Sequence, residues 1–274
     1  MDNKDLTFQQ KVLIWGRTFL RGATPLLIYI MMPAATLSFG YVAFNMDMSA
    51  KEFFSYGGNF YTAIGMMLAL YVLHKRSQRR GHKFFEDATL YLEKAEWKKS
   101  ICFFVFGMAA ALTLSSVLTL LPRWGIVNDY SESSQTMFKG LDMLFTLITT
   151  MITAPLAEEI VFRGYMLNTF LEQFDVKKSI LSVSAIFAIC HGDPLWILYA
   201  MGMGILLCWL SIREDNIYYG ILLHMGFNTP SGLIWIMRSY PEVYDLFFTS
   251  KLLIFGYGLA CALLCIRLAK KYLS

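Results

Sequence analysis

Charged side chains are scarce in this chain. Asp, Glu, Lys and Arg make up 16% of its 274 residues, whereas 56% of the residues are hydrophobic and the mean hydropathy is +0.48. Much of the apolar content stands in long uninterrupted runs, as in membrane-spanning helices. No polar segment is long enough to fold around a core of its own, which argues against a separate soluble domain. We therefore predict an all-α fold, a polytopic membrane bundle of about eight transmembrane helices, as a single integral-membrane domain over residues 1–274.

Cysteine is also sparse. All five cysteines fall inside apolar runs, where a thiol behaves as a small hydrophobic group. A disulfide framework is therefore not expected. Cys190 precedes His191, but adjacent residues on a helix point to different faces, which disfavours a Cys–His nucleophile. We interpret all five cysteines as packing residues.

Targeting and anchoring patterns are missing as well. Residues 1–10 are polar and lack a cleavable signal pattern, and the C-terminal Lys-Lys-Tyr-Leu-Ser has no cysteine four residues from the end. We expect a chain that spans the bilayer without a lipid anchor. No nucleic-acid partner is expected.

The positive charges are unevenly distributed between the apolar runs. Residues 74–100 contain eight Lys and Arg residues, whereas residues 122–142 have no cationic excess. Cytoplasmic loops of membrane proteins are enriched in Lys and Arg. We therefore predict that residues 74–100 and both termini face the cytoplasm, and that residues 122–142 lie outside. We expect a prokaryotic cell membrane as the location.

Two adjacent carboxylates and an arginine interrupt the apolar stretch of residues 154–167. An ionisable side chain at membrane depth costs several kcal/mol unless it is paired or faces a water-filled cavity, which makes it a functional candidate. On a helix, Glu159 and Arg163 are one turn apart and can pair. Glu158 is turned about 100° away from Glu159 and stays available for chemistry.

Two further polar clusters lie in later apolar runs. His191 follows Phe187 by one helical turn, and Asn228 follows His224 by the same spacing. The charges of the loops indicate in which direction each predicted span crosses the bilayer. From the helical rise per residue along these spans, both clusters and Glu158 lie between the midplane and the cytoplasmic third of the bilayer. The sequence therefore predicts a common polar cavity that is open to the cytoplasm.

The residue types in this cavity are sufficient for peptide hydrolysis. A glutamate that is partly shielded by apolar neighbours is suited to take a proton from water, and a histidine can help to hold that water. His224 and Asn228 share a helical face, so their N–H groups could point together at the oxyanion that forms when water attacks an amide.

In these three clusters the sequence resembles the CAAX prenyl endopeptidase and bacteriocin-processing (CPBP or Abi) family of intramembrane glutamic proteases. The motifs of that family are Glu-Glu-x-x-x-Arg, Phe-x-x-x-His and His-x-x-x-Asn, and they occur here in that order within residues 143–240. The matching residues are Glu158, Glu159, Arg163, Phe187, His191, His224 and Asn228.

The resemblance implies an intramembrane endopeptidase that cleaves near the cytoplasmic side, with its protease core over about residues 143–240 and no cofactor. Glu158 would be the general base and His191 its partner on the water. His224 and Asn228 would stabilise the oxyanion.

The resemblance also implies which residues support the site and what the site acts on. Glu159, Arg163 and Phe187 would be structural. The implied partners are membrane lipid and a peptide or membrane-protein substrate, such as a prenylated protein or a leader-containing precursor.

Three alternatives remain open. Glu158, His191 and His224 could bind zinc, since two histidines and a glutamate form a known catalytic ligand set, although no His-Glu-x-x-His is present. A non-catalytic membrane scaffold or a bacteriocin-immunity protein could keep the fold and lack the chemistry. A transporter would also place ionisable residues at mid-depth, but no internal repeat is visible.

Overall fold

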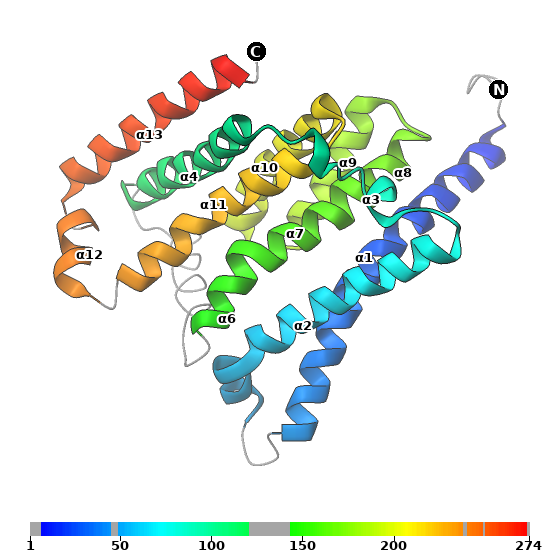
Figure 1. The fold of residues 1–274 in the computed structure, drawn as a ribbon, viewed down its shortest axis with the longest axis horizontal. Coiled ribbons are helices and arrows are strands. Elements are labelled where there is room, and N and C mark those ends of the chain that lie inside the picture. The colour runs from blue at the N-terminus through cyan, green and yellow to red at the C-terminus, as the bar shows by residue number, and fades with distance from the viewer. Residues whose placement is uncertain (1–6, 45–48, 121–142, 238–239, 249, 273–274) are drawn as a thin grey trace.

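The described part of the chain is a bundle of helices without strands, which confirms the predicted all-α class (Figure 1). The structure is a computed structural model and describes residues 7–44, 49–120, 143–237, 240–248 and 250–272. The predicted outer segment of residues 122–142 lies outside these ranges. The α-helices are α1 (Phe8–Phe44), α2 (Ala50–Arg79), α3 (Phe84–Asp87), α4 (Trp97–Leu120), α6 (Met143–Ile148), α7 (Ala154–Glu159), α8 (Asn168–Leu171), α9 (Val176–Ile189), α10 (Pro194–Glu214), α11 (Tyr218–Met237), α12 (Pro241–Phe248) and α13 (Lys251–Tyr272).

Five helical segments in the described residues are long and apolar enough to cross a membrane. They are Val12–Ala43, Trp97–Leu120, Leu144–Leu171, Pro194–Glu214 and Lys251–Tyr272. The chain is therefore an integral membrane protein, but the expected number of about eight spans is not confirmed. Helix α9 shows why, because its 14 residues rise only about 21 Å, less than the hydrocarbon thickness of about 30 Å.

Residues 143–171 form one continuous helical run through the middle of the bundle (Figure 1). In this run, α6, α7 and α8 alternate with two π-helical stretches, Thr149–Thr153 and Ile160–Leu167. Pro155 follows the first stretch and has no N–H to donate to the preceding turn. A wider turn accommodates this missing hydrogen bond, and π-helical turns occur often at functional sites.

The other helices pack in pairs on both sides of this run (Figure 1). Helix α1 runs along α2, α9 along α10, and α4 along both α11 and α13. Helices α4 and α11 approach closely at two glycines. A Cβ atom on Gly226 would lie 2.1 Å from the carbonyl oxygen of Phe104, and one on Gly107 would lie 2.1 Å from that of Leu223. Small residues at such crossings let membrane helices pack backbone to backbone.

The chain turns between α9 and α10, at Gly192, Asp193 and Pro194. Gly192 adopts a positive φ of 75° after α9. Asp193 then caps α10 by accepting hydrogen bonds from the backbone N–H groups of Leu195 and Trp196, and Pro194 occupies the first turn, where no donor is needed. The segment after the second motif is therefore a helix stop followed directly by a helix start.

The five cysteines are all free thiols in the structure. Cys208 is buried, whereas Cys190 is exposed. The interpretation of every cysteine as a packing residue is therefore wrong for Cys190, because α9 ends just before it and leaves its side chain uncovered.

Candidate active site

The two adjacent glutamates at the end of α7 lie in different environments. The side chain of Glu158 is 17% exposed and lines a cavity, whereas that of Glu159 is fully buried. This difference follows from helix geometry, since consecutive residues point about 100° apart. One carboxylate can therefore meet a substrate while the other is enclosed by protein.

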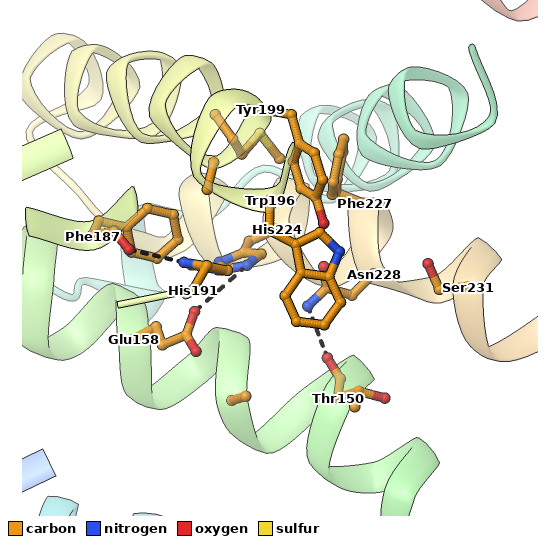
Figure 2. A pocket seen from close by; sticks show the side chains of 13 residues that line it. Thr150, Glu158, Phe187, His191, Trp196, Tyr199, His224, Phe227, Asn228 and Ser231 are labelled. Carbon is orange, nitrogen blue, oxygen red and sulfur yellow. Dashed lines mark hydrogen bonds and ion pairs between the residues drawn. The ribbon is translucent and has the colours of Figure 1, made fainter. Parts of the chain in front are cut away.

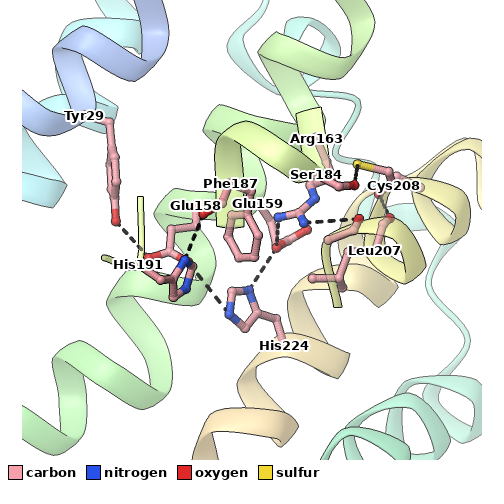
Figure 3. A network of polar contacts seen from close by, with 12 residues as sticks. Tyr29, Glu158, Glu159, Arg163, Ser184, Phe187, His191, Leu207, Cys208 and His224 are labelled. Atoms are coloured by element: carbon pink, nitrogen blue, oxygen red, sulfur yellow. Dashed lines mark hydrogen bonds and ion pairs between the residues drawn. The ribbon is translucent and has the colours of Figure 1, made fainter. Parts of the chain in front are cut away.

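Glu159 forms a buried ion pair with Arg163. Nη1 of Arg163 lies 2.7 Å from Oε1 of Glu159, and neither side chain is exposed. The guanidinium also lies over the ring of Phe187, with Cζ 4.3 Å from the ring centre. A desolvated cation is stabilised by an aromatic face as well as by its counter-ion. The predicted pairing of these two residues is present, and Phe187 belongs to the same cluster (Figure 3).

His224 on α11 lies between the two carboxylates (Figure 3). Its Nδ1 is 2.9 Å from Oε1 of Glu159, and its Nε2 is 3.8 Å from Oε2 of Glu158. Because an ionised carboxylate can only accept, Nδ1 carries the proton in the bond to Glu159. The sequence assigned Glu159 to Arg163 and missed this second contact, since no periodicity relates residues on separate helices.

His191 follows the end of α9 and is oriented by that helix. Its Nδ1 lies 2.8 Å from the carbonyl oxygen of Phe187, and its ring contacts the Phe187 ring at a centroid distance of 4.8 Å. A carbonyl oxygen only accepts, so Nδ1 is the donor here too. In the neutral ring, Nε2 then has a free lone pair that can accept a hydrogen bond from water.

Asn228 lies one turn after His224, and both side chains line the cavity, as their spacing predicted. Nδ2 of Asn228 donates a hydrogen bond of 2.9 Å to the carbonyl oxygen of Thr150, which lies in the first π-helical stretch (Figure 2). An amide nitrogen carries two hydrogens, so one N–H remains for a ligand.

These side chains meet at one cavity of about 210 Å³. Figure 2 shows Glu158, His191 and His224 gathered at one end of it. Helices α10 and α11 provide much of the apolar wall, with Trp196, Tyr199, Ala200, Met203 and Phe227. The cavity therefore joins a polar end to an apolar wall, as expected of a site that binds an apolar ligand next to reactive groups.

Tyr29 on α1 also contacts the site and was missed by the sequence analysis. Its hydroxyl donates a hydrogen bond of 3.0 Å to Oε1 of Glu158 (Figure 3). The chain has 15 tyrosines, and nothing in the local sequence distinguishes this one from the others. The contact joins residues 129 positions apart.

Metal binding by Glu158, His191 and His224 was the second reading of this cluster. In the part of the chain that the structure describes, no group of three or more His, Cys, Asp or Glu side chains is arranged to hold a metal ion. The histidines hold Nδ1 against oxygen acceptors, which is the orientation that both a metal site and a hydrogen-bonding site would use.

The fold and the site define a helical integral membrane protein with buried charges around a cavity. Residues 140–230, which include all three motifs, match the family model described as "Type II CAAX prenyl endopeptidase Rce1-like". This match confirms the resemblance seen in the three motifs.

Two curated proteins are similar to part of the chain. The "Putative membrane peptidase YdiL" of Bacillus subtilis (strain 168) is 29% identical over 112 residues, which cover 40% of this chain and 45% of that protein. The "Uncharacterized 24.3 kDa protein" of Escherichia coli is 32% identical over 93 residues, which cover 32% of this chain and 43% of that protein. The chain thus spans less than half the length of either relative. No solved structure matches it significantly.

Proposed function

We propose that this protein is an intramembrane endopeptidase of the glutamic type. The observation that carries the proposal is the convergence of Glu158, His191, His224 and Asn228 on one cavity from three separate segments of the chain. The match of residues 140–230 to a family model described as a CAAX prenyl endopeptidase supports the same reaction class.

In the proposed reaction, Glu158 is the general base. A water molecule is held between its carboxylate and Nε2 of His191, and Glu158 takes a proton from this water as the oxygen attacks the substrate carbonyl carbon. The proton is then delivered to the nitrogen of the departing amine. The carbon–nitrogen bond breaks, and the products are a carboxylate and an amine.

Asn228 and His224 stabilise the oxyanion in this proposal. Asn228 offers its second N–H. His224 can donate from Nε2 only when its ring is cationic, because Nδ1–H is already directed to Glu159. Both carboxylates lie beside this ring, with Oε2 of Glu158 3.8 Å from Nε2 and Oε1 of Glu159 2.9 Å from Nδ1.

The apolar wall of the cavity supports a peptide or membrane-protein substrate with an apolar segment beside the cleaved bond. A prenylated protein and a leader-containing precursor both remain proposals, as does the site of cleavage near the cytoplasmic face of a prokaryotic membrane. The location of the basic residues between 74 and 100 supports that orientation.

Substrate trapping with Glu158→Gln tests the proposal. The amide has nearly the shape of the carboxylate but cannot take the proton, so the variant should fold, bind substrate and release no products. The full-length variant and the unaltered protein, each in membranes, are cross-linked to neighbours, and the captured proteins are identified by mass spectrometry. Glu172→Gln is the control, because Glu172 lies on the surface and pairs with Arg21.

We expect an intact partner on Glu158→Gln that is found cleaved with the unaltered protein and with the control variant. Full processing by Glu158→Gln would contradict the proposal. Full function of Glu158→Gln, with a captured partner that none of the three proteins cleaves, would favour the non-catalytic scaffold or immunity protein of the same fold.

A further inference from the structure

Tyr29 reaches the site from a helix outside the Rce1-like region of residues 140–230. Its hydroxyl lies 3.0 Å from Oε1 of Glu158, whereas the other oxygen, Oε2, is directed at Nε2 of His224 (Figure 3). Among the residues that the structure describes, the phenol is the one group that donates a hydrogen bond to the Glu158 carboxylate. The orientation of that carboxylate therefore depends on α1.

The ring of Tyr29 is held by apolar packing. It contacts two groups of buried residues, one that includes Phe162 and one that includes Ala157. Both groups include residues of the helical run that carries Glu158. Packing against them limits the movement of the Tyr29 ring relative to the core of the bundle.

The backbone of α1 is also fixed along its length. A Cβ atom on Gly65 of α2 would lie 2.3 Å from Cα of Pro33, and one on Gly22 would lie 2.9 Å from the ring of Phe170 on α8. These close approaches lie on both sides of Tyr29 in the sequence. These close contacts at Gly22 and Gly65 therefore determine the position of α1 along its neighbours and the direction in which Tyr29 points.

We propose that Tyr29 is a positioning residue for Glu158. Its hydroxyl holds Oε1 and thereby keeps Oε2 directed towards the cavity and His224. By donating to the carboxylate, it also stabilises the ionised form that acts as base. The assignment rests on the proposed function of Glu158, and it means that α1 completes a site whose other polar residues belong to residues 140–230.

The test uses dicyclohexylcarbodiimide, which labels carboxyl groups in apolar surroundings when they are protonated. The purified full-length protein is treated across a range of pH values, and modification of Glu158 is measured by peptide mass spectrometry. The titratable and charged groups around Glu158 are Tyr29 on α1, Cys190 and His191 after α9, His224 on α11, and Glu159 with Arg163 on its own helical run. All except Tyr29 stay unchanged in the test variant.

In Tyr29→Phe, labelling of Glu158 should persist to higher pH than in the unaltered protein, because the ionised carboxylate loses a hydrogen-bond donor. Tyr165→Phe is the matched control. It also removes a partly buried tyrosine hydroxyl and one interhelical hydrogen bond, here the 2.8 Å bond to Oγ of Ser77. Its labelling profile should coincide with that of the unaltered protein.

A second measurement keeps the hydroxyl and so does not depend on the folding of Tyr29→Phe. With 3-fluorotyrosine at position 29, the more acidic phenol is a stronger donor, and labelling should cease at lower pH. A profile unchanged by either substitution would overturn the assignment.

The labelling experiment and the hydrolysis assay test different claims, so one can fail while the other succeeds. If the labelling shifts occur in a protein that cleaves no substrate, the positioning of Glu158 by Tyr29 stands and the proposed endopeptidase is wrong. If the protein cleaves but the labelling profile does not move, the endopeptidase stands and the role of Tyr29 is wrong.

Discussion

His224 Nδ1 lies 2.9 Å from Oε1 of Glu159, the same oxygen that receives the guanidinium of Arg163 at 2.7 Å. The buried ion pair and the cavity are therefore parts of one network. Glu159 does not line the cavity, yet it determines how the imidazole of His224 is presented to it. This arrangement predicts that changes to the ion pair affect both stability and the site.

Arg163→Ala should reduce the stability of the protein strongly. The substitution leaves Glu159 charged and enclosed without its counter-ion, and removing one partner of a buried ion pair destabilises proteins by about 3–5 kcal/mol. Arg21→Ala is the matched control, since it breaks an exposed pair with Glu172 that contributes about 0–1 kcal/mol. Thermal unfolding of the two purified variants and their accumulation in membranes give the comparison. Equal stability of both variants would show that Glu159 does not depend on Arg163.

Asn228→Ala should lower turnover by about 10²- to 10³-fold, as expected for the loss of one oxyanion donor. Activity of the unaltered protein should survive exhaustive chelation, because the proposed chemistry uses a glutamate and hydrogen bonds. Turnover of a substrate captured by Glu158→Gln, together with elemental analysis for zinc, provides the measurement. Stoichiometric zinc that disappears with activity in His191→Ala, and activity restored by added metal, would establish the zinc mechanism instead.

Gly226→Val should separate α4 from α11 and displace His224 and Asn228. A Cβ atom at this position would meet the backbone of Phe104 at 2.1 Å, and backbone cannot move aside as a side chain can. We expect loss of activity together with a lower unfolding temperature. Gly202→Ala on α10 is the control, because a Cβ atom there has no neighbour within 4 Å and helix propensity favours alanine by about 0.5–1 kcal/mol. A fully stable Gly226→Val would mean that the two helices pack less closely than the structure shows.

A cysteine placed at Gln78 should be inaccessible to a membrane-impermeant thiol reagent added to intact cells. The prediction follows from the excess of Lys and Arg between residues 74 and 100, which favours the cytoplasmic side. The same probe should react once the cells are opened. Since the chain has five free thiols, the experiment uses a background in which these are replaced by serine or alanine. Labelling of the probe in intact cells would invert the proposed topology.

The helical membrane class and the three motifs could be predicted from the sequence because both depend on short-range patterns. Long apolar runs specify helices that are stable in lipid. Glu159 and Arg163 lie one turn apart on a helix, so their pairing follows from its geometry. The stop at Gly192 and the cap at Asp193 likewise depend on residues that are adjacent in the chain.

The number of spans was harder to predict than the helical membrane class. An apolar run does not show how much of its length is covered by other helices and how much meets lipid. Helix α9 is too short to cross a bilayer alone, yet its apolar residues are used in packing against α10 and the central helical run. Apolar composition is the same whether a side chain meets lipid or protein. The sequence therefore could not distinguish a crossing helix from a shorter packed one.

The sequence by itself determined which residue types are present at which helical spacing, and so which chemistry is available. The tertiary structure decided how these residues are connected. His224 reaches Glu159 because α11 also packs against α7, where a Cβ atom on Gly220 would lie 3.4 Å from Oε2 of Glu159. Tyr29 reaches Glu158 because α1 lies against the central helical run. Such contacts depend on the packing of whole helices, which joins residues 65 and 129 positions apart. No local sequence pattern predicts such a contact, because the spacing of residues along one helix does not depend on which helix packs beside it.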